Sequence, residues 1–212
     1  MPLKIKKATL PKGEIGIWDI SESEVFFRSL LDLSEEEFVF INKIKGRRKL
    51  EWLASRYLLH YMSGREERGM CLKDEFGKPY LKDSDHKISL SHSWNYAAVI
   101  ASPHNVGIDI QRKVDKIKRI AHKFMSDQEF ESIDNILQIE HLHVFWGAKE
   151  AIFKAYGRKE LAFKEHIQIY AFKYDPLGGK FEAKLKKDEI QMNFQGAYEI
   201  MDDHFLVYVI EI

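Results

Sequence analysis

The segment from Phe145 to Gly157, FWGAKEAIFKAYG, restricts the fold more than any other part of the sequence. Glu150 and Lys154 are four residues apart, so on a helix they lie on nearly one line. Ordinarily such a pair is a surface ion pair worth about 0.3–0.5 kcal/mol. The alternative is an acid–base pair that holds a metal, takes a proton or binds phosphate. The apolar face that has to be buried beside the pair is formed by Phe145, Ala148, Ile152 and Tyr156.

The residues after this helix predict β-structure only. Apolar residues alternate or run together in four segments, which are separated by turn sequences rich in Gly, Pro and Asp. The pattern predicts a meander of about four strands, over Ile167–Phe172, Phe181–Leu185, Met192–Ile200 and Phe205–Ile212.

The composition excludes several classes of protein. A chain of 212 residues forms one large domain or two small subdomains. Lys+Arg and Asp+Glu are both 33, so the chain lacks the basic excess of a general nucleic-acid or membrane-surface binder. No apolar run approaches the ~20 residues of a membrane span, and MPLKIKKATL is not a signal peptide. The single cysteine, Cys71, excludes an internal disulfide and a Cys-based zinc cluster, and we expect it to be a packed free thiol in a cytoplasmic protein.

A basic run precedes the predicted helix Leu50–Met62. Residues Lys43 to Lys49, KIKGRRK, include five basic residues in seven, and Arg56 follows on the helix. Such a run is usually a solvated face, and its alternative is a site for phosphate groups. Lys78 lies on the turn of Phe76–Tyr80, where a solvated lysine is the ordinary interpretation.

An aspartate lies inside an apolar strand. Tyr96–Ala101 and Val106–Ile110 are joined by Pro103-His104-Asn105 and predict a β-hairpin. Asp109 shares one face of the second strand with Gly107 and Gln111. A carboxylate there is unfavourable unless it is paired or holds a cation. Gly107 leaves room for another group to approach closely.

Asp109 and Glu150 together suit a hard cation. The chain has no second cysteine, and His141 and His143, two apart on a helix, cannot chelate one metal. Two carboxylates from different elements are typical ligands of Mg²⁺, which fills its shell with water and substrate phosphate. Neither GxxxxGK[ST] nor GxGxxG occurs, which argues against nucleotide binding by those routes.

Several motifs, in order and spacing, resemble the 4′-phosphopantetheinyl transferases of the single-chain, Sfp-type group. The resemblance covers roughly residues 47–157 and is specific in the combination of the last two motifs. The motifs are Glu51-Trp52-Leu53-Ala54-Ser55-Arg56, Gly77-Lys78-Pro79, Ser89-Leu90-Ser91-His92-Ser93, Gly107-Ile108-Asp109-Ile110, and Trp146 to Lys154, WGAKEAIFK.

The resemblance implies an α+β fold with two similar α/β subdomains related by a pseudo-twofold, over residues 1–104 and 105–212. The active site would lie in the cleft between them, where Asp109 and Glu150 meet. It also implies a Mg²⁺-dependent transfer of the phosphopantetheine arm of coenzyme A to a serine of an apo acyl- or peptidyl-carrier protein, with release of adenosine 3′,5′-bisphosphate. A monomer is expected, with no nucleic-acid or membrane partner.

The resemblance also assigns roles to residues. Asp109 and Glu150 would bind Mg²⁺, Glu150 would take the serine proton, and Lys154 would neutralise or protonate the leaving phosphate. Coenzyme A phosphates would be held by Lys78, Ser91 and His92, with Arg47, Arg48 and Arg56 as further candidates, one of them for the 3′-phosphate.

Gln111 departs from the family pattern. Many members have a carboxylate at this position, two residues after the aspartate. The amide oxygen of Gln111 can still touch the metal or its water but brings no charge, so we expect weaker Mg²⁺ binding. One alternative is therefore a non-catalytic binder of coenzyme A or of a carrier protein, and another is a Mg²⁺-dependent enzyme acting on a nucleotide diphosphate. Exposed apolar residues Phe124 and Met125 are a candidate surface for the carrier.

Overall fold

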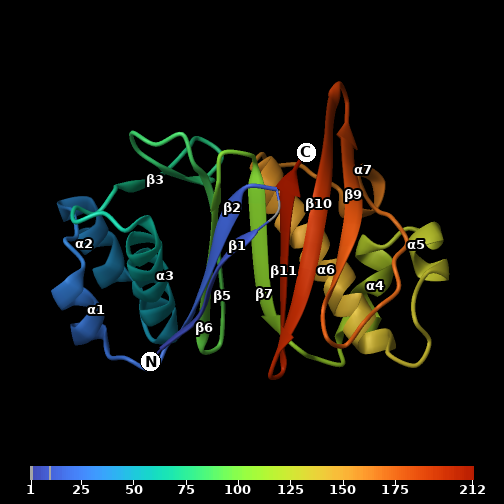
Figure 1. Ribbon diagram of the computed structural model, residues 1–212, viewed down its shortest axis with the longest axis horizontal. Helices are drawn as coiled ribbons and strands as arrows, with labels where there is room; N and C mark the ends of the chain where they lie inside the picture. The colour runs from blue at the N-terminus through green and yellow to red at the C-terminus, as the bar shows by residue number, and fades with distance from the viewer. Residues whose placement is uncertain (1, 10) are drawn as a thin grey trace.

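The protein has four layers, with two antiparallel sheets face to face between two layers of helices (Figure 1). The computed structural model describes residues 2–9 and 11–212. Within these residues no helix is both long enough and apolar enough to cross a membrane. The layering confirms the expected α+β class with two α/β halves.

The first sheet and its helices come from the N-terminal half of the chain. The six strands have the order β1-β2-β6-β5-β4-β3. The helix covering the outer face of the sheet is α3 (Arg47–Ser63), with α1 (Glu24–Leu30) and α2 (Glu35–Lys43) outside it (Figure 1). Ser34 followed by Glu37 predicts a capping box from the sequence, and the structure has it at the start of α2. The strands are β1 (Leu3–Thr9), β2 (Gly13–Asp19), β3 (Cys71–Lys73), β4 (Pro79–Leu81), β5 (Lys87–Ser93) and β6 (Tyr96–Ser102).

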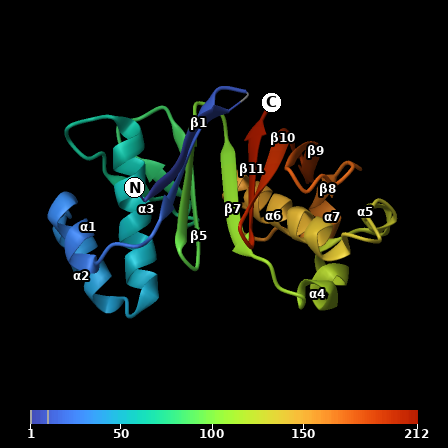
Figure 2. The same cartoon turned by 60° about the horizontal axis from the view of Figure 1, so that its bottom comes forward.

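The second sheet has five strands in the order β7-β11-β10-β9-β8. Its outer face carries the long helix α6 (Gln138–Tyr156), which ends at Gly157 in the left-handed conformation, as expected. Figure 2 shows α4 and α6 side by side on this face. The other elements are β7 (Val106–Arg112), α4 (Ile117–Phe124), α5 (Asp127–Glu131), α7 (Phe163–His166), β8 (Ile167–Ile169), β9 (Gly179–Lys187), β10 (Ile190–Met201) and β11 (His204–Glu211).

Three apolar cores hold the layers together. One lies between α3 and the first sheet and another between α6 and the second sheet. The third joins the inner faces of the two sheets, where β2 and β6 pack against β7 and β11. Burial of apolar area on this scale is the main favourable term in folding. The buried members of this central core are Ile15, Ile17, Tyr96, Ala98, Ile100, Val106, Ile108, Ile110, Leu206 and Ile210.

The predicted hairpin of Tyr96–Ala101 with Val106–Ile110 is wrong. β6 pairs with β2 and β5 in the first sheet, whereas β7 pairs with β11 in the second. Both edges of β6 are therefore occupied, and no edge is left for β7. The turn after Ser102 carries the chain from one sheet to the other, which short-range turn chemistry cannot reveal.

Two further expectations about the region after β7 are corrected. The sequence predicts a helix over Asp127–Leu137 with Ser126 as its cap. Ser126 does cap α5, but the helix ends at Glu131, and the Asp134 carboxylate accepts from the Ile136 and Leu137 amides to hold a turn beyond it. Phe124 and Met125, expected to be exposed, are buried against α6 in the second core. They therefore cannot form a contact surface for a partner.

Candidate functional site

The candidate site lies where β5 of the first sheet meets β7 of the second. The free edge of β7 is hydrogen-bonded by side chains instead of a strand. The amide of Ile108 donates to Ser89 Oγ at 3.1 Å, and that of Ile110 donates to Ser91 Oγ at 3.2 Å. The alternation of serines along β5 therefore has a structural reason, because buried backbone donors need acceptors. Asp109 lies between these two amides on β7.

Lys154 joins three groups at this junction. Its ammonium donates to Asp109 Oδ1 at 2.7 Å, to Ser91 Oγ at 3.0 Å and to the Ile108 carbonyl at 2.9 Å. Ser91 Oγ also donates to Asp109 Oδ1 at 3.1 Å. Only 11% of the Asp109 side chain is exposed. A carboxylate this buried needs a partner, and Lys154 and Ser91 supply it.

Glu150 lies one helical turn before Lys154 on α6. Burial raises the pKa of its carboxyl, and the negative charge of Asp109 raises the pKa further, while Lys154 opposes both effects. Both raising effects favour the protonated form of the Glu150 carboxyl. A carboxylate with a raised pKa is a stronger general base than an ordinary one.

Close contact between α6 and β7 creates this arrangement. A Cβ atom on Gly107 would lie 1.7 Å from the Ala151 carbonyl oxygen and 3.0 Å from the Ala155 amide nitrogen. Only glycine therefore lets the helix backbone come this near to the strand. The room predicted beside Asp109 is filled by α6, and this contact places Glu150 and Lys154 over the strand.

Lys78 reaches the same helix from the first half of the chain. Its ammonium donates to the carbonyl of Ala155, and its side-chain carbons lie against Gly157. Burial lowers the pKa of Lys78. A small cavity of about 140 Å³ separates the two halves here, and its lining includes Lys78, Ser89, Phe153, Lys154 and Gly157.

His92 is the residue before the last on β5. Its Nδ1 lies 3.0 Å from Glu51 Oε2 on α3. Burial lowers the pKa of His92, the Glu51 charge opposes this, and Lys154 and Arg48 lower the pKa further. The contact with Glu51 joins the end of β5 to α3.

Three predicted site residues have other partners. Arg47 donates to the Trp94 and Ile20 carbonyls and to Asn95 Oδ1, so it fastens the start of α3 to the β5–β6 turn. Gln111 donates from Nε2 to the His143 carbonyl at 3.0 Å, which ties β7 to α6. Arg56 is buried with its guanidinium 4.8 Å from the centre of the Trp52 ring, beside a different cavity.

Several residues important to the site were not predicted from the sequence. Ser89 and Glu51 act through contacts between distant segments, which no local pattern reveals. Lys149, next to Glu150, is fully buried and donates to Glu129 Oε2 at 2.8 Å and to two carbonyls. The only signal for Lys149 was its position four residues after Phe145, which puts it on the apolar side of α6.

The donor set fits a hard cation with few protein ligands. Among the described residues no group of three or more His, Cys, Asp or Glu side chains could hold a metal, so Asp109 and Glu150 are the carboxylates available here. The charge of Asp109 raises the pKa of Glu150, and a divalent cation bound to both carboxylates would relieve this repulsion.

Comparison with known proteins finds relatives of part of the chain. A model of the 4′-phosphopantetheinyl transferase superfamily matches residues 105–200, which include Asp109, Glu150 and Lys154. The 4′-phosphopantetheinyl transferase gsp of Aneurinibacillus migulanus is 31% identical over 130 residues, covering 58% of this chain and 54% of that protein. This chain is similar to 4′-phosphopantetheinyl transferases.

Two further relatives are similar over shorter segments. The 4′-phosphopantetheinyl transferase Sfp of Bacillus subtilis (strain 168) is 28% identical over 88 residues, covering 40% of this chain and 39% of that protein. The match with a putative 4′-phosphopantetheinyl transferase of Synechocystis sp. is 29% identical over 91 residues. The chain thus spans about half or less of the length of these relatives.

Proposed function

We propose that the protein transfers the 4′-phosphopantetheine group of coenzyme A to a serine of an apo acyl- or peptidyl-carrier protein. The observation that carries this proposal is the Asp109–Lys154–Ser91 network with Glu150 one helical turn from Lys154. Asp109, Glu150 and Lys154 lie inside the region matched by the family model. A base, a cation and two neighbouring carboxylates are the groups that phosphoryl transfer to a hydroxyl needs.

In the proposed reaction Glu150 takes the proton of the carrier serine. The serine oxygen then forms a bond to the β-phosphorus of coenzyme A, and the bond from that phosphorus to the bridging oxygen breaks. Adenosine 3′,5′-bisphosphate leaves with the electron pair, and Lys154 meets the charge that develops on it. Mg²⁺ held by Asp109 and Glu150 would supply charge neutralisation for the pyrophosphate when bound.

Coenzyme A binding is proposed for the cations around the small cavity between the halves. Lys78, Lys154, Arg158 and Lys159 line this cavity, and Ser91 contacts both members of the Asp109–Lys154 pair. Positive side chains gathered at one cleft favour a substrate with several phosphates. Coenzyme A contacts of His92 and Arg48 stay predictions. Coenzyme A contacts of Arg47 and Arg56, and a metal contact of Gln111, stay predictions, since these residues have the other contacts described above.

We further propose that the two halves are subdomains meeting near residues 104 and 105, with the active site between them. The change of sheet after β6 supports this boundary. The cytoplasmic location, the monomeric state and the absence of nucleic-acid and membrane partners stay predictions from the sequence.

The test is incubation of the protein with coenzyme A, Mg²⁺ and several apo carrier proteins in parallel, followed by intact-mass measurement. We expect at least one carrier to gain the mass of one phosphopantetheine group on its serine, together with release of adenosine 3′,5′-bisphosphate. A carrier with that serine changed to alanine is the control. If coenzyme A binds but no carrier gains mass, the protein is a non-catalytic binder and the proposal fails.

A further inference from the structure

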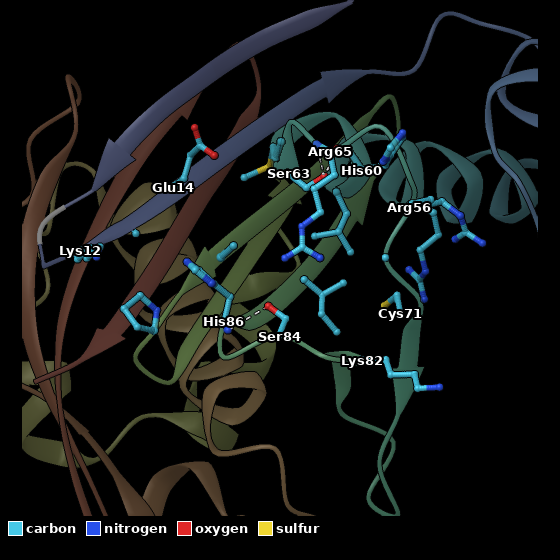
Figure 3. A pocket seen from close by; sticks show the side chains of 18 residues that line it. Lys12, Glu14, Arg56, His60, Ser63, Arg65, Cys71, Lys82, Ser84 and His86 are labelled. Atoms are coloured by element: carbon cyan, nitrogen blue, oxygen red, sulfur yellow. Dashed lines mark hydrogen bonds between the residues drawn. The ribbon is translucent and has the colours of Figure 1, made fainter.

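A second, larger cavity lies away from the candidate site. Its volume is about 330 Å³, within the range of small-molecule sites. It opens between the C-terminal half of α3, the β1–β2 turn and the β4–β5 loop. In Figure 3, Lys12 and Glu14 border one side, His60 and Arg65 another, and Ser84 and His86 the side facing α3. None of Lys78, His92, Asp109, Glu150 and Lys154 lines it.

Cations predominate in the lining of this cavity. Its charged residues other than histidine are Lys12, Glu14, Arg56, Arg65, Arg68 and Lys82. Arg68 is already neutralised, because it forms a two-pronged ion pair with Glu37. Within residues 2–9 and 11–212, no carboxylate pairs with Arg56, Arg65 or Lys82. The cavity is therefore electropositive.

Arg56 is the strongest indication of a ligand. Only 8% of the residue is exposed, and its Nε has no hydrogen-bond partner among the described residues. Its one contact with a protein acceptor is from Nη1 to Ser55 Oγ at 3.3 Å. Trp52 packs against the guanidinium and fixes its orientation. A buried cation with unused donors is costly unless an acceptor, such as an anion, reaches it.

Part of the cavity wall is apolar. Leu59 and Met62 contribute from α3, and Leu81 contributes from β4. Cys71 also lines the cavity, close enough to Arg56 for the guanidinium charge to act on its thiol, although burial raises the pKa of Cys71 overall. A ligand for such a cavity needs an anionic head and an apolar body.

We propose that this cavity binds a small organic anion, with a carboxylate or phosphate monoester head at Arg56 and an apolar body against Leu59, Met62 and Leu81. The site is separate from the proposed coenzyme A site, so its occupancy does not depend on whether the transferase proposal holds.

Cys71 offers a direct test, because it is the single cysteine of the chain and lines the cavity. The rate of reaction of the native protein with an aromatic disulfide thiol reagent is measured with octanoate, with octyl phosphate and with octyltrimethylammonium. With free ligand at about ten times its Kd, about nine sites in ten are filled, so we expect an anionic probe to slow the reaction about tenfold. The cationic probe, which has the same chain, is expected to leave the rate unchanged.

The two anionic probes distinguish the head groups, and protection by either one supports the proposal. Protection by neither anion, or equal protection by the cation, overturns it. The rate of Cys71 reaction is also measured with a coenzyme A analogue that lacks a thiol. If that analogue protects Cys71 as octanoate does, the cavity belongs to the coenzyme A site and the proposal of a separate site is wrong.

Two variants locate the head group. Arg56→Met and Lys82→Met each remove one cation. For each variant, the rate of Cys71 reaction with a probe present is compared with the rate of the same variant without a probe. Arg119→Gln, on the exposed side of α4, removes a charge outside the cavity and is the matched control. We expect the first two to weaken anion binding at least about tenfold and the control to leave it unchanged. Lys82 is exposed, so its variant keeps the test valid if Arg56→Met does not fold. Unchanged binding in both variants contradicts the assignment of the head group.

Discussion

Lys149 and Lys154 lie five residues apart on one helix and have different environments. Lys149 is fully buried and saturated by Glu129 and two carbonyls between α5, α7 and β8. Lys154 is partly exposed and bridges Asp109, Ser91 and the Ile108 carbonyl at the junction of the halves. The first lysine therefore supports the fold, and the second has its donors at the candidate site.

Substitution of each lysine by methionine separates these roles. Lys149→Met leaves the Glu129 carboxylate buried without its cation, so we expect the free energy of unfolding to fall by about 3–5 kcal/mol. Lys154→Met leaves Asp109 with Ser91 and partial access to solvent, so we expect a smaller loss of stability but loss of phosphopantetheine transfer. Denaturant unfolding and transfer assays on both variants provide the measurement. Equal stability losses in the two variants contradict the assignment.

The amide of Gln111 favours the stability of the fold but supplies no charge for a metal. Its Nε2 donates to the His143 carbonyl, which a carboxylate cannot do. A carboxylate would, however, add a charged ligand beside Asp109. We therefore expect Gln111→Glu to bind Mg²⁺ more tightly, measured by calorimetry, and to lose about 1–3 kcal/mol of stability through the unsatisfied carbonyl and its repulsion. Gln111→Ala loses the same hydrogen bond without gaining charge and is the control. Tighter metal binding in Gln111→Ala than in Gln111→Glu contradicts this account.

At the scale of elements, the contact of α6 with β7 determines the geometry of the site. Gly107 permits it, since any side chain at that position meets the helix backbone. The hydroxyls of Ser89 and Ser91 complete the other edge of β7. The position of Asp109 therefore depends on β5 from the first half of the chain and on β7 and α6 from the second half.

A methyl group at Gly107 is expected to be poorly tolerated. Gly107→Ala forces α6 away from β7, because a backbone oxygen cannot rotate aside, and we expect a loss of roughly 1–3 kcal/mol or more. Gly69→Ala is the matched control, since the nearest atom to its Cβ is a Leu81 methyl at 3.7 Å. Thermal unfolding of both variants provides the measurement. A Gly107→Ala protein as stable as Gly69→Ala contradicts the close contact.

Local patterns predicted most elements but not how they pair. The capping residues Ser34 and Ser126, the αL end at Gly157 and the strands of the tail follow from short-range chemistry, and the structure has them. The hairpin of β6 with β7 was wrong because pairing depends on which edges distant strands leave free. The close contacts of Asp109 with Ser91 and Lys154 likewise needed the assembled sheets.

At the scale of the whole molecule, buried histidines make stability depend on pH. Burial lowers the pKa of His141 from 6.5 to about 4 and also lowers the pKa values of His143 and His204. At pH values between about 4 and 6.5, His141 binds more protons in the unfolded chain than in the folded one. The free energy of unfolding therefore falls as the pH is lowered from 6.5 towards 4.

Denaturant unfolding at a series of pH values between 7 and about 4.5 tests this dependence. We expect His141→Gln, which keeps an acceptor for the Asp134 amide, to be less stable at pH 7 but to lose less stability on acidification. His122→Gln, at an exposed position on α4, is the control and should retain the full dependence. If His141→Gln follows the same pH profile as the unaltered protein, His141 does not contribute.

The central claim is that Glu150 acts at the site of phosphopantetheine transfer. The most direct measurement compares the unaltered protein, Glu150→Gln and Glu140→Gln for coenzyme A binding and for mass gain of an apo carrier with Mg²⁺. Glu140 lies on the same helix but pairs with Lys113, away from the site. We predict that Glu150→Gln binds coenzyme A and transfers at least about 10²–10⁴ times more slowly, while Glu140→Gln transfers normally. Near-normal transfer by Glu150→Gln would contradict its role as base and metal ligand.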